Sequence, residues 1–196
     1  MSGRTRVLFV GVGGQGVLSA ARLLGDAAVA AGCDATLGQL HGMSQRGGGV
    51  ESSVVIGAAR SSSIGRGQAD VVAGFEPMET LRAIDRMSER TLVVANRDRI
   101  STAEMTRGGQ PYPDLTELFD RISSIAPRTQ AVDITHLARE AGDPRSLGVV
   151  LLGWISALGG LPFGEQPLRA AIEHRYHGAA RRANLRALAL GLERTV

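Results

Sequence analysis

The amino-acid sequence predicts an α/β fold, in which strands and helices alternate along one chain. Short runs rich in Val, Ile and Leu end at glycine, as Arg6–Val10 does, and they alternate with alanine- and leucine-rich stretches of helical spacing, such as Val17–Ala31. The length of 196 residues corresponds to about one domain, and 43% hydrophobic residues are enough for one core. Residues 1–196 are therefore expected to form a single domain.

The first predicted unit is a strand, a glycine turn and a helix. Arg6–Val10 is β-branched and aromatic and stops at Gly11, which is typical of a buried strand. Val17–Ala31 follows with apolar residues at helical spacing and is ended by a glycine. Asp34–Leu40 is then a candidate second strand, and Val50–Ile56, which has Val and Ile with Ser between them, is predicted as the third.

The middle of the chain repeats the strand–helix rhythm after a polar, glycine-rich loop. Short apolar runs predict its strands, and apolar residues that recur every three or four positions predict its helices. The sequence Gly-Gly-Gln-Pro-Tyr-Pro cannot be helical and predicts a long connection. In chain order we expect a loop at Gly57–Gln68, a strand at Asp70–Gly74, a helix at Glu76–Met87, a strand at Thr91–Ala95, a connection at Arg97–Pro113, a helix at Asp114–Ile122, a strand at Thr129–Val132 and a helix at Ile134–Ala141.

The last third of the sequence changes character, because helical periodicity continues without an intervening strand. Asp143 followed by Pro144 is typical of a helix N-cap with proline at the first helical position. We expect helical stretches at Asp143–Leu158, Gln166–His174 and His177–Leu192. The elements together describe an α/β domain with a helical C-terminal layer.

Composition excludes several classes of function. All 22 basic residues are arginine and are interleaved with acidic residues, so the net charge of +3 indicates solvated surface rather than a nucleic-acid-binding stripe. A chain without lysine cannot use a Walker A loop or a Schiff-base lysine. Cys33 is the one cysteine, so this chain alone cannot form an intrachain disulfide or ligate an iron–sulfur cluster.

Neither a membrane segment nor a metal site is predicted. No apolar run approaches the roughly 20 residues needed to cross a bilayer, and Val7–Val10 is too short for a signal peptide. We expect a cytoplasmic protein with no membrane or nucleic-acid partner. His174 and His177 form an H-x-x-H pair without a third ligand at matching spacing. Cys33 is interpreted as a buried small residue rather than a nucleophile.

The first glycine-rich segment, Gly11–Gly16, matches G-x-G-x-x-G between a predicted strand and a predicted helix. Such glycines let the backbone turn tightly and let a phosphate approach the amides at the helix N-terminus. A nicotinamide site also needs an acidic residue at the end of the second strand, where Gly38–His41 stand, so that cofactor is disfavoured. Two other interpretations of this segment remain open. It is either a tight turn alone or a loop that binds another anion or faces a partner.

The second glycine-rich segment, His41–Gly49, is the more unusual of the two. A parallel sheet would place it at the carboxyl ends of the strands beside the first loop, where open α/β sheets bind ligands. Ser44, Gln45 and Arg46 offer hydroxyl, amide and guanidinium donors, and successive glycine amides can form a concave anion site. The alternative is a wide loop whose polar residues meet solvent.

Four motifs, taken in order, resemble a known family. They are Val10-Gly-Val-Gly-Gly-Gln-Gly-Val, Leu40-His-Gly-Met-Ser-Gln-Arg-Gly-Gly-Gly, Ala69-Asp-Val-Val-Ala-Gly-Phe-Glu-Pro and Asn184-Leu-Arg-Ala-Leu-Ala-Leu-Gly. They resemble the gamma domain of 2-oxoacid:ferredoxin oxidoreductases, and most of all its indolepyruvate-using members. The likeness spans nearly the whole chain and implies a three-layer α/β/α sandwich with a Rossmann-like, mostly parallel sheet.

The resemblance implies one subunit of an oxidative decarboxylase that is inactive alone. In such enzymes a 2-oxo acid, here indolepyruvate or another aryl pyruvate, reacts at thiamine diphosphate, loses CO2 and is passed to coenzyme A. Electrons leave through iron–sulfur clusters to ferredoxin. The resemblance therefore implies a partner subunit that holds thiamine diphosphate, magnesium and the clusters.

Matching the motifs residue by residue assigns both loops to a site that faces a ligand or partner. We expect the loops to face the partner's active site and Arg46 to assist catalysis by contacting a phosphate or the substrate carboxylate. The alternative is a stand-alone Rossmann-like module that binds a nucleotide or acyl-CoA without redox activity. The assigned residues are Gly11, Gly13, Gly14, Gln15 and Gly16 in the first loop, and His41, Gly42, Ser44, Gln45, Arg46, Gly47 and Gly48 in the second.

Overall fold

The chain folds around a six-stranded sheet, seen in a computed structural model that describes residues 3–41, 48–100 and 111–193. The spatial order of the strands is β2-β3-β1-β4-β5-β6. β1, β4, β5 and β6 pair in parallel, whereas β3 runs antiparallel to both β1 and β2. The expected mostly parallel sheet is confirmed. The strands are β1 (Thr5–Val12), β2 (Ala35–His41), β3 (Gly49–Ile56), β4 (Val71–Gly74), β5 (Leu92–Asn96) and β6 (Arg128–Val132).

Because β3 is antiparallel to β2, the second glycine-rich segment joins two neighbouring antiparallel strands. Val12 at the end of β1 is opposite Gly49 at the start of β3, and Val50 is opposite His41 at the end of β2. β1 and β2 therefore run in the same direction. β2 therefore ends and β3 begins at the carboxyl edge of the sheet, beside the end of β1, although the parallel direction expected for β3 from the sequence is wrong.

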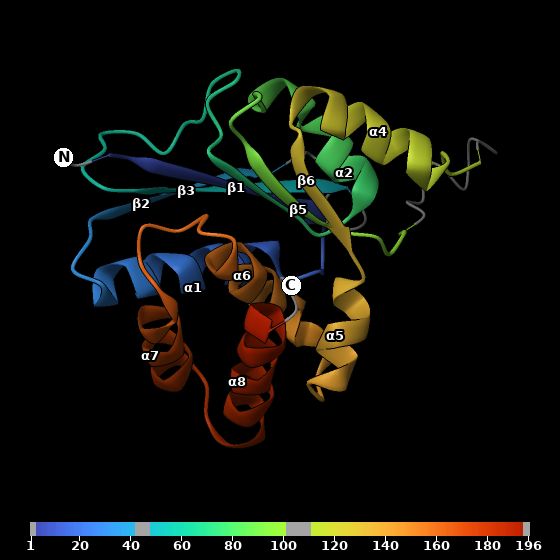
Figure 1. Ribbon diagram of the computed structural model, residues 1–196. Helices are drawn as coiled ribbons and strands as arrows, with labels where there is room; N and C mark the ends of the chain where they lie inside the picture. The colour runs from blue at the N-terminus through green and yellow to red at the C-terminus, as the bar shows by residue number, and fades with distance from the viewer. Residues whose placement is uncertain (1–2, 42–47, 101–110, 194–196) are drawn as a thin grey trace.

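Helices cover both faces of the sheet (Figure 1). One face carries α2 and α4, and the other carries α1, α5 and α6. Farther out on this second face, α7 packs against α1 and α8 packs against α6. The three-layer sandwich and its helical C-terminal segment are confirmed. Among the described residues, the α-helices are α1 (Val17–Ala30), α2 (Pro77–Arg82), α4 (Leu115–Ile125), α5 (Ile134–Glu140), α6 (Leu147–Ala157), α7 (Glu165–Arg175) and α8 (Gly178–Glu193).

Buried side chains form a core on each side of the sheet. The larger core includes Phe9 and Phe75 with apolar residues of α1 and α6, and the smaller core includes Leu8 of β1 and Ile122 of α4. α6 is buried along nearly its whole length and crosses α8 at close range. The absence of a side chain on Gly153 permits this approach, since a Cβ there would lie 2.6 Å from the Leu188 carbonyl oxygen. This close crossing fixes the C-terminal helices against the sheet.

The helix predicted at Glu76–Met87 is shorter than expected. α2 ends at Arg82 and is followed by a 3-10 turn at Ile84–Arg86. The carbonyl oxygens of Asp85 and Arg86 accept hydrogen bonds from the amides of Gly67 and Ala69, both at 3.0 Å. The prediction of one continuous helix is therefore wrong beyond Arg82, and these two bonds hold the 3-10 turn against the loop that precedes β4.

The remaining differences are small. The Asp143 side chain caps a 3-10 turn at Pro144–Ser146, accepting from the Arg145 amide at 2.9 Å, and α6 begins after this turn. Residues 57–68 form the expected loop. Of the connection predicted at 97–113, positions 101–110 lie outside the described residues. Within the described ranges, none of the helices combines the length and apolar composition that crossing a membrane requires.

Candidate functional site

The first glycine loop makes a tight turn into α1. Gly14 and Gly16 have φ values of +100° and +85°, a left-handed conformation that favours glycine. Gly11 is constrained by packing instead, because a Cβ there would lie 2.6 Å from the Cβ of Phe75. α1 begins after Gly16 with no side-chain cap and no acidic residue in its first turn. Its first amides and its positive dipole end are therefore available to an anion.

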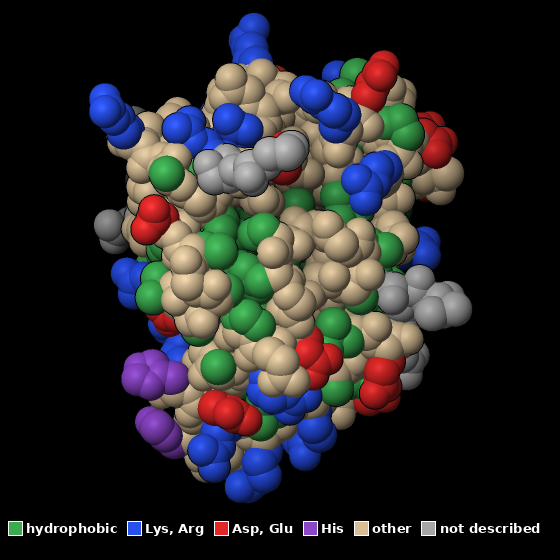
Figure 2. All heavy atoms as spheres, turned by 60° about the vertical axis from the view of Figure 1, so that its left-hand side comes forward, with side chains coloured by type: hydrophobic (Ala, Val, Ile, Leu, Met, Phe, Trp, Pro, Cys, Tyr) green, Lys and Arg blue, Asp and Glu red, His purple; other side chains and the backbone are tan. Residues whose placement is uncertain are grey.

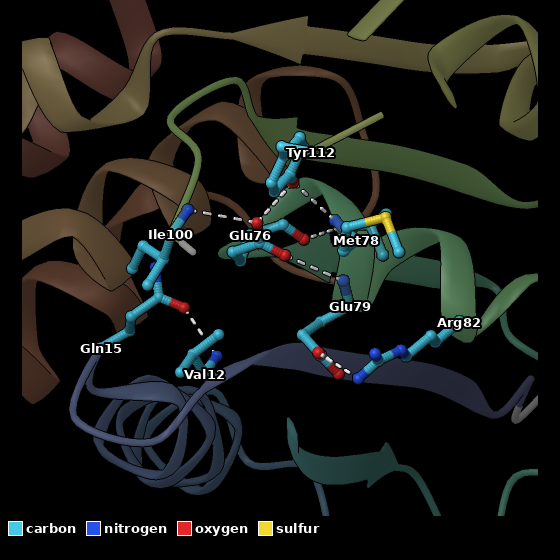
Figure 3. Close-up of polar contacts among 9 residues, drawn as sticks. Val12, Gln15, Glu76, Met78, Glu79, Arg82, Ile100 and Tyr112 are labelled. Atoms are coloured by element: carbon cyan, nitrogen blue, oxygen red, sulfur yellow. Dashed lines mark hydrogen bonds and ion pairs between the residues drawn. The ribbon is translucent and has the colours of Figure 1, made fainter. Parts of the chain in front are cut away.

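The Gln15 side chain fixes the shape of this turn from within. Its Oε1 accepts a hydrogen bond from the Val12 amide at 2.7 Å, and its Nε2 donates to the Phe75 carbonyl at 2.9 Å. Figure 3 shows Gln15 directed at Val12 rather than away from the chain. These bonds give Gln15 a structural role, and the ligand role predicted for it stays a prediction.

The bases of the two glycine-rich segments are joined directly. The Gly13 amide donates a hydrogen bond to the Gly48 carbonyl oxygen at 3.1 Å. The structure therefore brings together the first loop and the end of the second, as the sequence predicted. Gly42, Ser44, Gln45, Arg46 and Gly47 lie outside the described residues, as does the side chain of His41.

Glu79 lies against the start of β3, at the base of the second segment. A Cβ on Gly49 would overlap the Glu79 carboxylate, whose carbon would lie 3.1 Å from it. Glu79 is 7% exposed and accepts a hydrogen bond from Arg82 at 2.7 Å. Burial raises the pKa of Glu79 above its ordinary value, Arg82 opposes the rise and Glu76 adds to it. A side chain at position 49 would therefore displace the end of the Glu79 side chain, a contact that the sequence does not reveal.

Glu76, which follows β4 at the carboxyl edge, is the most enclosed charged side chain of the site. It is 1% exposed, and its carboxylate accepts from the Glu79 amide at 3.0 Å, the Ile100 amide at 3.3 Å and the Tyr112 hydroxyl at 2.5 Å (Figure 3). The same hydroxyl accepts from the Met78 amide at 3.2 Å. Glu76 therefore ties α2 to the connection that follows β5 on both sides of its undescribed part.

Burial and the hydrogen bond to Glu76 raise the pKa of Tyr112 well above its usual value. Its phenol therefore remains a donor to the carboxylate over the ordinary pH range.

Asn96 joins three strand ends of the same edge. It is fully buried, and its Oδ1 accepts from the amides of Ile134 and Thr135 at 3.1 and 3.3 Å. Its Nδ2 donates to the Thr135 hydroxyl at 2.9 Å and to the Phe75 carbonyl at 3.3 Å. The Phe75 carbonyl is the acceptor that Gln15 also uses. One polar network thus links the first glycine loop to the ends of β4, β5 and β6.

Sequence reasoning missed the roles of Glu76, Asn96 and Tyr112. The acid–proline pair at Glu76 and Pro77 is an N-cap signal, which the structure bears out. The sequence shows that Asn96 places a polar side chain at the end of an apolar strand, but it does not identify the groups to which that side chain bonds. Cys33 is half-buried rather than buried, and it lines a separate hollow of about 800 Å³ at the opposite edge of the sheet.

A cleft of about 690 Å³ opens beside the first loop. Its size suits a small organic ligand, and it combines the start of α1 with polar groups from the C-terminal helices. Within the described residues, no group of three or more His, Cys, Asp or Glu side chains could hold a metal ion. The cleft is lined by Gly14, Gln15, Gly16, Ser19, Asp98, Ile100, Thr135, Asp143, Pro144, Arg145, Leu147, Tyr176, Ala180 and Asn184.

The mostly parallel sheet, with two glycine-rich turns meeting at its carboxyl edge, defines a Rossmann-like α/β domain with an anion-compatible crevice. The family model described as pyruvate ferredoxin/flavodoxin oxidoreductase matches residues 6–194. The chain belongs to this family, and the resemblance noted from its motifs is confirmed.

Relatives and a solved structure agree with this assignment. The chain is 34% identical over 193 residues to the indolepyruvate oxidoreductase subunit IorB of Archaeoglobus fulgidus, covering 98% of this chain and 96% of that protein. It is 36% identical over 189 residues to the subunit of the same name from Thermococcus kodakarensis, covering 95% and 94%. The gamma subunit of the keto/oxoacid ferredoxin oxidoreductase from Geobacter sulfurreducens, with 22% identity, superimposes with a TM-score of 0.69 over 96% of each chain. That likeness supports the fold alone.

Proposed function

We propose that this chain is one subunit of a 2-oxo acid oxidoreductase that acts on indolepyruvate or another aryl pyruvate and delivers electrons to ferredoxin. The observation that carries the proposal is identity of about one third to IorB subunits over nearly the full length of both proteins. Residues 1–196 form a single gamma-type domain in this proposal.

The reaction we propose needs groups that this chain does not supply. The 2-oxo acid loses CO2 and its acyl group passes to coenzyme A, while two electrons leave for two ferredoxin molecules. Thiamine diphosphate with magnesium supplies the decarboxylation chemistry, and iron–sulfur clusters carry the electrons. Cys33 is the only cysteine in the sequence, so it cannot provide the four thiolates of a cluster. A partner subunit must hold these groups, and this chain alone is inactive.

The part we assign to this chain is to present its carboxyl edge to the partner's active site. The bond between the Gly13 amide and the Gly48 carbonyl supports this assignment, because it fixes the bases of both loops at one edge. The open amides of α1 and the guanidinium of Arg46 would then contact a phosphate or the carboxylate of the substrate. Gln15, Glu76 and Asn96 would act behind this surface by fixing the backbone.

Affinity purification of the tagged chain from its native host tests the proposal. We expect a brown eluate with iron–sulfur absorbance that reduces a dye when aryl pyruvate and coenzyme A are added, with dependence on thiamine diphosphate. A colourless chain that is recovered alone and binds a nucleotide or acyl-CoA would favour the stand-alone binding module instead.

A further inference from the structure

A groove beside the start of α8 adjoins the cleft at the first loop, with which it shares Asp143, Arg145 and Ala180, but its remaining lining residues have no part in the proposed function. Its volume is about 470 Å³, within the range of small-molecule sites. Small residues form its lining on two sides, Gly142 at the end of α5 and Ala179, Ala180 and Ala183 at the start of α8. Because these side chains are short, a ligand could approach the backbone and the surrounding charged groups closely.

Three arginines surround this groove, Arg145, Arg182 and Arg186, and its lining has one carboxylate, Asp143. Three positive charges against one negative charge leave a local charge of +2. Figure 2 shows basic side chains gathered at the lower end of the molecule, where Figure 1 places the connection between α7 and α8. The charge at the groove is thus part of a basic end of the molecule.

The three guanidinium groups are held to different degrees. Arg186 is oriented by a bond from its Nε to the Ala141 carbonyl at 2.8 Å, which leaves its terminal nitrogens beside Gly142. Arg145 binds Asp143 through Nε at 3.0 Å and Nη2 at 2.8 Å. Arg182 is exposed and has no hydrogen-bond or ion-pair partner among the residues that the structure describes.

Two further features favour an anion in the groove. Arg182 and Arg186 are four residues apart on α8, so both side chains lie on one helix face. The first turn of α8, a helix of 16 residues, carries no acidic residue and lines the groove with Ala179 and Ala180. The positive end of the helix dipole and the arginines therefore act on the same space.

We propose that this groove binds a diphosphate-type anion, held by Arg182 and Arg186 at the start of α8 and by Arg145 from the neighbouring turn. A guanidinium group can bind two phosphate oxygens at once, and a helix N-terminus favours phosphate through its free backbone amides and its positive dipole end. The Asp143 carboxylate competes with the ligand for Arg145 and lowers the affinity. The proposal rests on these contacts and charges and does not depend on the redox role.

Calorimetric titration of inorganic pyrophosphate into the purified full-length chain at low salt tests the proposal. We expect saturable one-to-one binding that weakens as sodium chloride is added. Arg182→Gln, which leaves a shorter, uncharged polar side chain, should weaken binding by about tenfold or more, because a charge-assisted contact is lost. The matched control is Arg121→Gln on α4, across the sheet, which removes the same charge and should leave the affinity unchanged.

A second variant, Asp143→Asn, is expected to raise the affinity for pyrophosphate rather than lower it. Asp143→Asn removes the competing charge and releases Arg145, so it should tighten pyrophosphate binding severalfold. The asparagine oxygen can still accept from the Arg145 amide, and an unchanged melting temperature checks that the turn is kept. Absence of saturable binding to the unaltered chain overturns the proposal. Equal weakening by Arg121→Gln and Arg182→Gln also overturns it, since only the net charge would then matter.

Discussion

Replacing Tyr112 with phenylalanine removes a hydroxyl from the most enclosed polar cluster of the carboxyl edge. The hydroxyl donates to Glu76 at 2.5 Å and accepts from the Met78 amide at 3.2 Å. Glu76 is 1% exposed, so water cannot readily replace the lost donor. The variant leaves a buried carboxylate with one donor fewer and an amide without its acceptor.

The expected cost follows from these two contacts. A hydrogen bond to a charged group is worth about 1.5–3 kcal/mol, and Tyr112 is half-buried, so we expect a loss of about 2 kcal/mol in the free energy of unfolding. For a chain of this length, that corresponds to a fall in melting temperature of about 4–8 °C.

Urea and thermal unfolding followed by circular dichroism provide the assay. Tyr176→Phe is the matched control, because the Tyr176 hydroxyl has no hydrogen-bond partner among the described residues. Combining Tyr112→Phe with Glu76→Gln in a double-mutant cycle should yield a coupling energy of about 1 kcal/mol or more. A loss below about 0.5 kcal/mol, or an equal loss in the control, would refute the assignment of Tyr112 as a donor to a buried charge.

The raised pKa of Tyr112 adds a prediction about pH. The folded chain holds the phenolic proton more tightly than the unfolded chain, whose tyrosines titrate near pH 10. This contribution to stability is fully present below about pH 10 and is lost as the pH rises above it. The sequence has two tyrosines, so the Tyr176→Phe chain reports Tyr112 alone by its absorbance at about 295 nm. A midpoint near pH 10 in the folded chain would contradict the buried contact.

The remaining predictions concern single positions at the same edge. Gly49→Ala should destabilise the fold by about 1 kcal/mol in urea unfolding, because its Cβ displaces the Glu79 carboxylate and weakens the bond to Arg82, whereas Gly3→Ala, in open space, should not. Glu79→Gln should remove a stability contribution that is present below about pH 4.5 and is lost as pH rises, so unfolding curves of the two chains should diverge with pH. Asn96→Leu should cost about 2–4 kcal/mol in urea unfolding, since the buried Ile134 amide and the half-buried Thr135 amide lose their acceptor. Arg46→Ala should lower turnover of the assembled complex more than about tenfold without preventing assembly, and unchanged kinetics would exclude its assisting role.

The regular elements could be predicted because each depends on a local pattern. Val17–Ala30 is helical where apolar residues recur at helical spacing, and Asp143 caps a turn where an aspartate precedes proline. The direction of β3 and the end of α2 depend on distant parts of the chain. Nothing near Asp85 in sequence reveals that its carbonyl accepts the Gly67 amide.

The residues of the candidate site likewise fall into those that a local sequence pattern identifies and those that depend on distant contacts. Gly14 and Gly16 could be identified from sequence because a tight turn before a helix selects glycine for its backbone conformation. Glu76 could not be assigned, because its partners Ile100 and Tyr112 lie 24 and 36 residues away. A buried acid is recognisable only when the fold shows which donors surround it.

The most direct test of the proposed subunit role is to omit this chain from the assembled enzyme and then restore it. Aryl-pyruvate-dependent dye reduction would be measured on the partner that carries thiamine diphosphate and the clusters, with increasing amounts of this chain. We predict negligible turnover without the chain and activity that rises to a plateau at a fixed stoichiometric ratio. Full turnover by the partner alone, or no response to the added chain, would contradict the account.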